Sequence, residues 1–251
     1  MTQSARYGWT ILLPVKVLAQ AKSRLAVLAG ERRRELALAL ASDTVSAVVA
    51  CPQVARVIVV TSDPVAGPRL LSLGARVIPE APRLVRRRDD RDDRDDRDDR
   101  DDRDDRASAR PNPDGSQHKL NAALLRGAAV ASRRWPGTGL AALTADLPAL
   151  RPAELAAALR AAAETGGAAF VPDAAGFGTT MYAVVPGAEF RPMYGGASRA
   201  RHAAGGATEL ALNGIAGLRQ DVDTPDDLRA AVALGVGPRT AEVAAELLAD
   251  A

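Results

Sequence analysis

VARVIVVT, residues 54–61, is the stretch that decides the fold. Apart from Arg56 and the closing Thr61 it is apolar, and most of its residues are β-branched. A nearly continuous apolar run of this length predicts a strand that is covered on both faces. Such strands are typical of parallel sheets with helices on either side, so the stretch predicts an α/β fold.

Outward from this strand, short apolar runs alternate with Ala- and Leu-rich segments of helical period. The further predicted strands are Trp9–Val15, Ala75–Ile78, Gly139–Thr144, Ala168–Pro172, Thr179–Val185 and Leu218–Val222. The predicted helices are Arg32–Val49, a short one ending near Leu73, one beginning at Leu120, Arg151–Thr165, and one that Thr224 caps. This alternation predicts one three-layer α/β domain over residues 1–251, with a mostly parallel, Rossmann-like sheet.

A low-complexity insertion, RRRDDRDDRDDRDDRDDRDDR at residues 86–106, interrupts this pattern between the third strand and the next helix. It contains nine Arg, twelve Asp and no apolar residue, so it has nothing to bury against the entropy cost of ordering. We expect this segment to be disordered. A partner-binding arm is the alternative, and deleting residues 88–106 would distinguish the two, because an enzyme should keep most of its turnover without it.

Charge and composition limit the function classes. The chain has a net charge of +2, and the insertion contributes −3, which leaves +5 elsewhere. This mild surplus suits small anionic ligands, while scattered basic residues and few aromatic ones argue against nucleic acid. No apolar stretch reaches the roughly 18 residues of a membrane span, and the N-terminal MTQSARYGWT lacks a signal-peptide core. We therefore expect a cytoplasmic protein without a membrane partner.

Polar groups follow several predicted strands, and ligands of open parallel sheets collect beyond the carboxyl ends of the strands. PVKVLAQAKSRL (14–25) follows the first strand and offers basic residues to a triphosphate, although it contains no P-loop or dinucleotide fingerprint. A solvated basic loop is the alternative. Asp146 in LTADLPAL and Asp223 in DVDTPDDL each follow a predicted strand and can together bind Mg²⁺. The alternative for each is helix capping.

A fourth group lies in GFGTTMYAV and YGGASRARH, where hydroxyls and glycine amides can surround a second anion. The ordered motifs LLPVKVLAQAKSRL, VIVVTSD, LNAAL, TADLPAL, GTTMYAV, GGASRARH and DVDTPDDL together resemble the 2-phospho-L-lactate or phosphoenolpyruvate guanylyltransferase family of coenzyme F420 biosynthesis. The resemblance covers nearly the whole chain apart from residues 83–118. It implies a nucleotidyltransferase fold related to the molybdenum cofactor guanylyltransferases, GTP as donor and Mg²⁺ as cofactor.

The resemblance also implies roles for single residues. Asp146 and Asp223 match the metal ligands and, with Lys22, the catalytic group. The resemblance implies that Lys22 and Asn121 bind the nucleotide, and the loop after the first strand adds Pro14, Lys16, Ser23 and Arg24 as candidates. Thr180, Gly195 and Ser198 match the positions that hold the phosphate of the acceptor. The chain departs from the family where Lys119 stands in place of the usual glycine, and in the long insertion beside the expected nucleotide pocket.

The implied reaction moves GMP from GTP to phosphoenolpyruvate, giving enolpyruvyl-diphosphoguanosine and pyrophosphate. 2-Phospho-L-lactate is the second candidate acceptor, because its difference from phosphoenolpyruvate is worth only about 1–3 kcal/mol in a pocket. 3-Phosphoglycerate is the third. A downstream transferase of the same pathway is an implied partner. A molybdopterin or sugar nucleotidyltransferase is the enzymatic alternative, although these usually carry a glycine-rich loop after the first strand, and a non-catalytic scaffold is the third.

Overall fold

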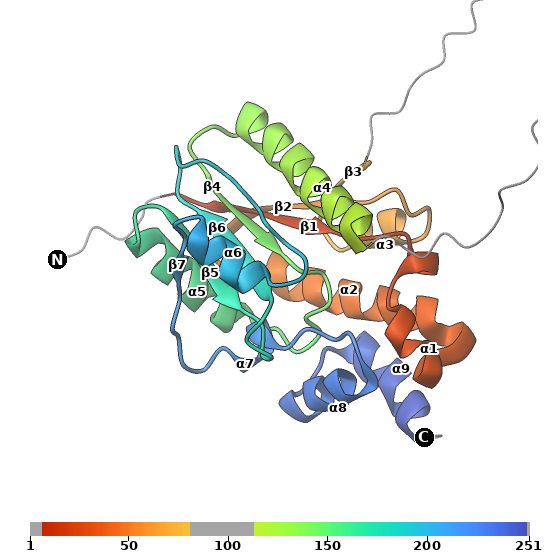
Figure 1. The fold of residues 1–251 in the computed structure, drawn as a ribbon. Helices are drawn as coiled ribbons and strands as arrows, with labels where there is room; N and C mark the ends of the chain where they lie inside the picture. The colour runs from red at the N-terminus through yellow and green to blue at the C-terminus, as the bar shows by residue number, and fades with distance from the viewer. Residues whose placement is uncertain (1–6, 81–112, 250–251) are drawn as a thin grey trace, which may run out of the picture.

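The fold is built on a seven-stranded mixed sheet, seen in a computed structural model that describes residues 7–80 and 113–249 (Figure 1). The strands are β1 (Trp9–Pro14), β2 (Val54–Val60), β3 (Arg76–Ile78), β4 (Gly139–Leu143), β5 (Ala168–Pro172), β6 (Thr179–Val184) and β7 (Thr208–Glu209). Their order is β3-β2-β1-β4-β6-β5-β7. Only β6 runs antiparallel to its neighbours among the described strands. The predicted insertion at residues 86–106 lies outside the described residues.

Helices cover both faces of the sheet and confirm the three-layer α/β prediction. α2 (Arg33–Val49), α3 (Ala66–Ser72) and α5 (Pro152–Glu164) pack on one face. α4 (Pro113–Arg134) and α6 (Ser198–Ala204) lie on the other, and Figure 1 shows α4 and α2 on opposite sides of β1. No helix within the described ranges is long and apolar enough to cross a membrane.

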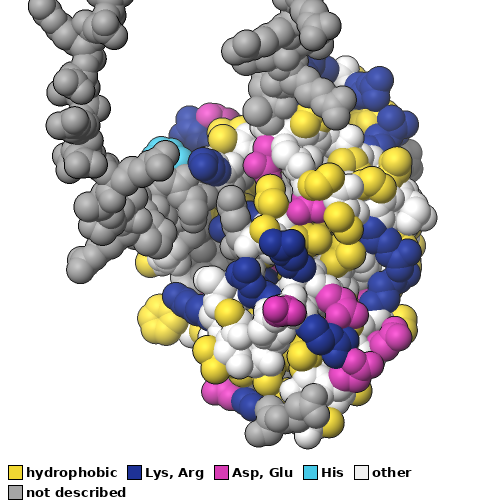
Figure 2. Space-filling model, turned by 90° about the vertical axis from the view of Figure 1, so that its right-hand side faces the viewer, with side chains coloured by type: hydrophobic (Ala, Val, Ile, Leu, Met, Phe, Trp, Pro, Cys, Tyr) yellow, Lys and Arg dark blue, Asp and Glu magenta, His cyan; other side chains and the backbone are white. Residues whose placement is uncertain are grey.

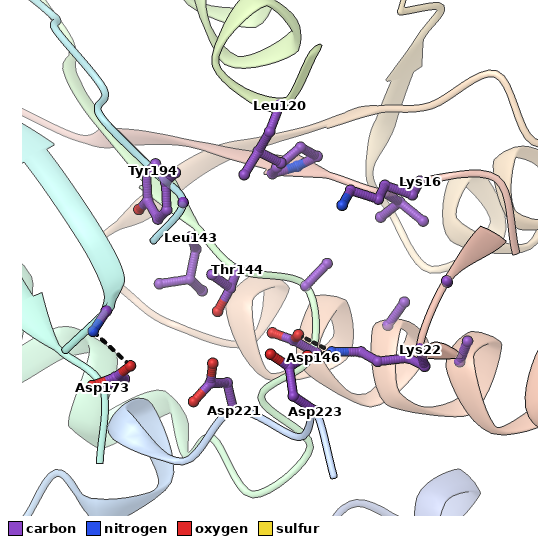
Figure 3. A pocket seen from close by; sticks show the side chains of 18 of the residues that line it. Lys16, Lys22, Leu120, Leu143, Thr144, Asp146, Asp173, Tyr194, Asp221 and Asp223 are labelled. Atoms are coloured by element: carbon purple, nitrogen blue, oxygen red, sulfur yellow. Dashed lines mark hydrogen bonds and ion pairs between the residues drawn. The ribbon is translucent and has the colours of Figure 1, made fainter. Parts of the chain in front are cut away.

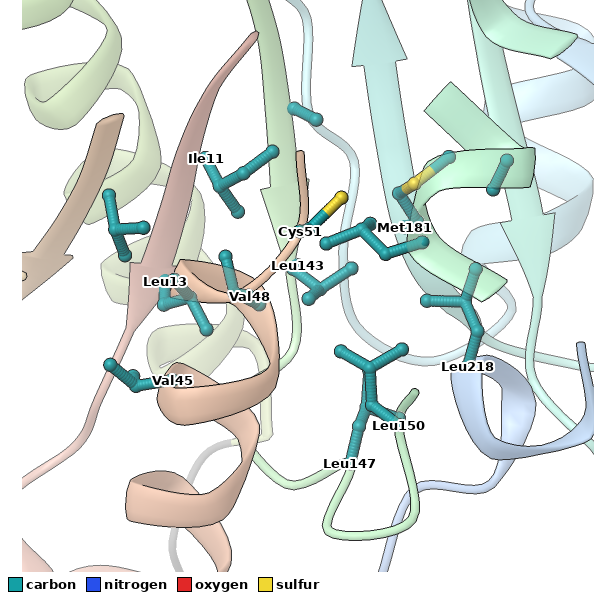
Figure 4. Packing of buried hydrophobic residues seen from close by; sticks show 14 of the residues in the cluster. Ile11, Leu13, Val45, Val48, Cys51, Leu143, Leu147, Leu150, Met181 and Leu218 are labelled. Atoms are coloured by element: carbon teal, nitrogen blue, oxygen red, sulfur yellow. The ribbon is translucent and has the colours of Figure 1, made fainter. Parts of the chain in front are cut away.

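The core follows from the alternation of side chains along β1. Ile11 and Leu13 point toward α2 and pack with Val45 and Val48 (Figure 4). The intervening Leu12 packs on the other face of the sheet, in a cluster with residues of α4. Cys51 is buried in the same hydrophobic cluster as Ile11 and Leu13. β1 is therefore covered on both faces, which fixes its carboxyl end as a rigid platform.

A further hydrophobic cluster lies between α2 and three other helices, two of which are C-terminal. α1 (Ala26–Ala29), α8 (Pro225–Leu234) and α9 (Pro238–Ala249) contribute to it. Buried Asp43 of α2 accepts a hydrogen bond of 2.7 Å from the Thr240 amide at the start of α9 and lies 3.2 Å from the Arg239 guanidinium. These contacts anchor the end of the chain against the beginning of the domain.

The predicted strand at Leu218–Val222 does not form. The chain makes a short helix there, α7 (Ala216–Arg219), and the sheet ends instead at β7. Gly217 of α7 packs closely against another segment, since a Cβ at this position would lie 2.1 Å from the Ala149 carbonyl oxygen. A tight turn packed against that backbone replaces the strand. α4 also begins earlier than predicted, at Pro113.

Candidate functional site

A cavity of about 450 Å³ opens at the edge of the sheet where β1, β4 and β5 end. Because β6 is antiparallel, its first residues lie at this same edge. Among the residues that line it are members of six parts of the chain: Pro14, Lys16, Lys22, Ser23, Arg24, Leu120, Thr144, Asp146, Asp173, Thr179, Tyr194, Gly195, Ser198, Asp221 and Asp223. Most of the residues that the sequence predicts for the site therefore line this one cavity.

The basic loop after β1 is held in a fixed conformation. It contains two short 3-10 turns, η1 (Leu18–Gln20) and η2 (Ser23–Leu25), and a third, η3 (Gly30–Arg32), follows α1. The Arg33 guanidinium donates to the carbonyl oxygens of Ala19 and Ala21 at 2.8 and 2.9 Å. Buried Asp63 accepts from the Leu18 amide at 2.8 Å. These contacts argue against the alternative of a merely solvated loop.

Lys22 has an unusual backbone within this loop. Its φ of 55° and ψ of 43° lie in the left-handed region, and it is the one non-glycine residue with positive φ in the described ranges. A residue with a Cβ adopts this conformation at a cost of about 1–2 kcal/mol. The surrounding contacts hold it there, and this directs the side chain into the cavity.

The Lys22 ammonium bridges the two aspartates that the sequence singles out (Figure 3). Its Nζ donates to Asp146 Oδ2, and it donates to Asp223 Oδ1 at 2.7 Å. The Lys22 side chain is 12% exposed and that of Asp146 is 19% exposed. The three residues that were expected to form the catalytic group are thus in direct contact.

Capping does not account for either aspartate. α5 begins only at Pro152, and Asp146 is held by Lys22. Thr224 caps α8, because its hydroxyl accepts from the Asp227 amide at 3.2 Å and its own amide donates to the Asp227 carboxylate at 2.8 Å. Both aspartates are therefore available for other chemistry.

The charges of this group are strongly coupled. Burial alone would lower the pKa of Lys22, but the carboxylates of Asp146 and Asp223 raise it above its usual value. Burial would likewise raise the pKa of Asp223, yet the nearby positive charges of Lys22, Arg24 and Lys16 bring it below its usual value. The lysine is therefore held as a cation against carboxylate charge.

The residues present fit a divalent metal. Asp146 Oδ1 is buried and has no hydrogen-bond partner in the described part of the chain, so one carboxylate oxygen is free for a ligand. No group of three or more His, Cys, Asp or Glu side chains gathers as a metal site among the described residues. A pair of carboxylates that leaves other positions to ligand oxygens suits Mg²⁺ bound together with phosphates.

Two further aspartates line the cavity that the sequence reasoning did not assign. Asp221 and Asp223 flank buried Val222 in an extended segment, and residues two apart in such a segment share one side. Asp173 follows β5 and accepts from the amides of Phe177 and Gly178 at 2.9 and 2.7 Å. The DVD spacing and the strand-end position of Asp173 were the available signals.

Asp221 differs from its neighbours in charge. Burial, followed by repulsion from Asp146 and Asp223, raises its pKa to about 8. A further cation near Asp221 would favour the ionised form of its carboxyl group. This end of the cavity therefore favours additional positive charge.

The opposite wall carries hydroxyls and glycine amides. Gly195 and Gly196 have φ values of +100° and +46°, which L side chains rarely adopt. Ser198, at the start of α6, and Thr179, at the start of β6, are both buried and line the cavity beside them. This wall can accept an anion, as the sequence predicts for Gly195 and Ser198.

Two expected residues occupy other positions. Thr180 is fully buried and does not line the cavity, and its hydroxyl lies 3.5 Å from the Val171 carbonyl oxygen. The neighbouring Thr179 lines the cavity instead, because successive strand residues face opposite sides. Asn121 does not line the cavity either. Its side chain accepts a hydrogen bond of 3.0 Å from the Tyr194 amide and donates one of 3.1 Å to the Tyr194 carbonyl oxygen.

The surface around these elements mixes both signs of charge. Figure 2 shows Lys and Arg side chains interspersed with Asp and Glu on the face seen from the right-hand side of Figure 1. The basic residues on this face do not form one continuous stripe. Positive charge that could act on a small anion is instead concentrated within the cavity, on Lys16, Lys22 and Arg24.

Comparison with known proteins gives close relatives over almost the full length. The chain is 49% identical over 246 residues to a phosphoenolpyruvate guanylyltransferase of Thermomonospora curvata, covering 98% of this chain and 92% of the relative. It is 51% identical over 241 residues to that of Streptomyces avermitilis, covering 96% and 95%. No family model matches the chain. Among solved structures, a CMP:2-keto-3-deoxy-manno-octonic acid synthetase complexed with CTP has a TM-score of 0.45 and 13% identity, covering 90% of this chain and 98% of that chain.

Proposed function

This chain belongs to the phosphoenolpyruvate guanylyltransferase family, and we propose that it moves GMP from GTP to the phosphate of phosphoenolpyruvate, using Mg²⁺ on Asp146 and Asp223. The products are enolpyruvyl-diphosphoguanosine and pyrophosphate. We place the reaction in coenzyme F420 biosynthesis, where a downstream transferase would take the product.

One observation carries the proposal: the contact of Lys22 with both Asp146 and Asp223 at the end of the cavity. The three residues come from the beginning, the middle and the last part of the chain, and no capping role explains the aspartates. The buried, unpartnered Oδ1 of Asp146 supports a cation at this point. A site for a metal–triphosphate complex requires carboxylates that bind the metal and cationic groups that bind the phosphates.

The donor side of the site is the loop after β1. Lys16, Lys22 and Arg24 line the cavity and can pair with the phosphates of GTP. Bound Mg²⁺ would neutralise part of the phosphate charge and polarise the α-phosphate. Asp146 and Asp223 would hold the metal, and the Lys22 ammonium beside them would then be able to contact the nucleotide phosphates.

The acceptor side is the wall formed by Thr179, Gly195 and Ser198. Their hydroxyls and amides line the cavity opposite the basic loop, so they can hold the anionic groups of a phosphorylated three-carbon acid. The acceptor and donor are both polyanions. Bringing them together is the main electrostatic barrier, and fixed groups on two walls lower it.

The bond changes need few groups from the protein. A phosphate oxygen of the acceptor attacks the α-phosphorus of GTP in line, the bond to the β-phosphate oxygen breaks, and pyrophosphate leaves. The attacking oxygen is already ionised near neutral pH, so no general base is required. Positioning and charge neutralisation are the contributions expected of the residues in this cavity.

Pyrophosphate release from purified protein with GTP and Mg²⁺ tests the function. Phosphoenolpyruvate, 2-phospho-L-lactate and 3-phosphoglycerate are compared as acceptors, and ATP replaces GTP as the donor control. Release that depends on GTP and is fastest with phosphoenolpyruvate supports the proposal. Release with another acceptor or donor corrects the substrate assignment, and no release from folded protein overturns the proposal.

A further inference from the structure

His202 is a buried, hydrogen-bonded residue that the proposed chemistry leaves unused. It lies in α6 and is fully buried, and its ring stacks on Tyr182 with the ring centroids 4.6 Å apart. Its Nδ1 lies 2.9 Å from the hydroxyl of Thr179, and its Nε2 lies 2.9 Å from the amide nitrogen of Met193. Both ring nitrogens therefore have partners.

The Met193 contact fixes which ring nitrogen carries the proton. A backbone amide can only donate, so Nε2 must accept, and the proton of the neutral ring lies on Nδ1. Burial, with a smaller effect from the positive charge of Arg201, lowers the pKa of His202 to about 4, so the ring is neutral near pH 7. Nδ1–H then donates to the oxygen of Thr179.

This donation has a consequence for Thr179. A hydroxyl that accepts from a histidine still has its own proton to give, and it must give it to another acceptor. Thr179 lines the cavity, on the wall that also carries Gly195 and Ser198. Because Thr179 lines the cavity, an anionic group bound there could accept this proton.

We propose that His202 is a positioning residue for the acceptor substrate, which acts by holding the Thr179 hydroxyl as a hydrogen-bond donor into the cavity. The inference rests on the proposed function, in which this wall binds phosphoenolpyruvate. His202 does not touch the substrate. It differs in this from Gly195 and Ser198, which line the cavity themselves.

The same ring aligns a second part of the wall. Met193 directly precedes Tyr194 and Gly195, and its amide is held by Nε2 of His202. Tyr194 is fixed independently, since its hydroxyl donates to the Ala142 carbonyl oxygen at 3.0 Å and Asn121 holds its backbone. Loss of the histidine should therefore change the orientation of the Thr179 hydroxyl more than the position of Tyr194 and Gly195.

Steady-state kinetics of His202→Phe test the inference, because phenylalanine keeps a stacked ring but can neither donate to Thr179 nor accept from Met193. We expect the KM for phosphoenolpyruvate to rise about 5- to 30-fold, the fold-change expected for a lost buried hydrogen bond, and the KM for GTP to change less than about twofold. His202→Asn, whose amide group lies near the Nδ1 position, should recover much of this loss. Equal losses in both variants, or equal changes in both KM values, would overturn the inference.

A double-variant comparison separates this role from a purely structural one. If His202 acts through Thr179, adding His202→Phe to Thr179→Val should change the KM for phosphoenolpyruvate by less than about twofold. If the two substitutions raise the KM for phosphoenolpyruvate independently, so that their fold-changes multiply in the double variant, the inference is contradicted. His118→Phe serves as the matched control, since His118 is exposed on α4 and should leave both KM values unchanged.

An NMR measurement on the unmodified protein does not depend on turnover. The chain has only two histidines, so the ring ¹⁵N signals of His202 are identified by their loss in His202→Phe. We expect a neutral ring protonated at Nδ1 between pH 6 and 8, and the Nε2–H form would overturn the inference. If the wild-type protein shows this ring form but releases no pyrophosphate, the proposed function fails separately from the hydrogen-bond assignment.

Discussion

Lys22 Nζ lies 2.7 Å from Asp223 Oδ1, although 201 residues separate them in the chain. The first basic loop and the last acidic segment are thereby joined at one point of the cavity. Asp146, from the middle of the chain, contacts the same ammonium group. The site therefore depends on the packing of α8 and α9 against α2, which places the acidic segment.

The Lys22 contact predicts a stability effect that Mg²⁺ should reverse. Lys22→Met should lower the free energy of unfolding by about 2 kcal/mol in Mg²⁺-free buffer, because two close carboxylates lose their counter-charge. Mg²⁺ should restore more stability in the variant than in the wild type. Thermal unfolding with and without Mg²⁺ measures this. Arg229→Met is the control, since it breaks only the exposed ion pair with Asp226 and should cost less than about 1 kcal/mol.

Asp146→Asn should abolish turnover, with a loss of about 10³-fold or more, because the amide cannot supply the negative charge that the proposed Mg²⁺ site requires. The fold should remain intact, as judged by circular dichroism. Pyrophosphate release measures the effect. Asp226→Asn is the matched control, because the Asp226 side chain is 93% exposed on α8 and should not affect turnover. Near-normal activity of Asp146→Asn would remove the metal assignment.

Gly195→Ala should damage acceptor binding beyond its effect on stability. Gly195 has a φ of +100°, and a Cβ there would lie 2.4 Å from Cγ of Gln117. Gly166→Ala is the control, because its φ of +69° is also unfavourable to alanine but nothing lies within 4 Å. Both variants should lose about 1–2 kcal/mol of stability. Only Gly195→Ala should raise the KM for phosphoenolpyruvate, and equal KM values in the two variants would contradict this.

His202 predicts an acid sensitivity of the fold. Its pKa is about 4 in the native state against 6.5 for an unperturbed histidine, because burial disfavours the cation. The unfolded chain therefore binds more protons between these values, and stability falls as the pH falls through this window. The loss amounts to roughly 3 kcal/mol between pH 6.5 and 4. Urea unfolding of wild type and His202→Phe at pH 7.5 and 4.5 measures it, and the variant should lose correspondingly less.

The sequence predicts those parts of the molecule that depend on local pattern. Apolar runs and strand-end polar residues predict most strands and bring Lys22, Asp146 and Asp223 to one edge of the sheet. The pattern fails where packing between distant segments decides the structure. Leu218 is as apolar as a strand residue, yet it lies in the short helix α7, whose Gly217 packs against the backbone of Ala149.

Neighbouring positions within the site show the same limit. Thr179 and Thr180 are identical in type, and only the register of β6 against β4 decides which one faces the cavity. Asn121 is polar and close to the site in sequence, but its side chain is used to hold Tyr194. Neither choice can be read from residue type alone.

The antiparallel direction of β6 has a consequence for how this enzyme can diversify. It lets one continuous stretch, residues 179–198, supply the proposed acceptor wall of Thr179, Gly195 and Ser198, whereas the proposed donor side combines residues 14–24 with two distant aspartates. Under the proposed function, the preference for the acceptor is therefore encoded in one short stretch of the chain. Exchange of residues 179–198 between relatives should then alter which acid is used and leave the nucleotide chemistry unchanged.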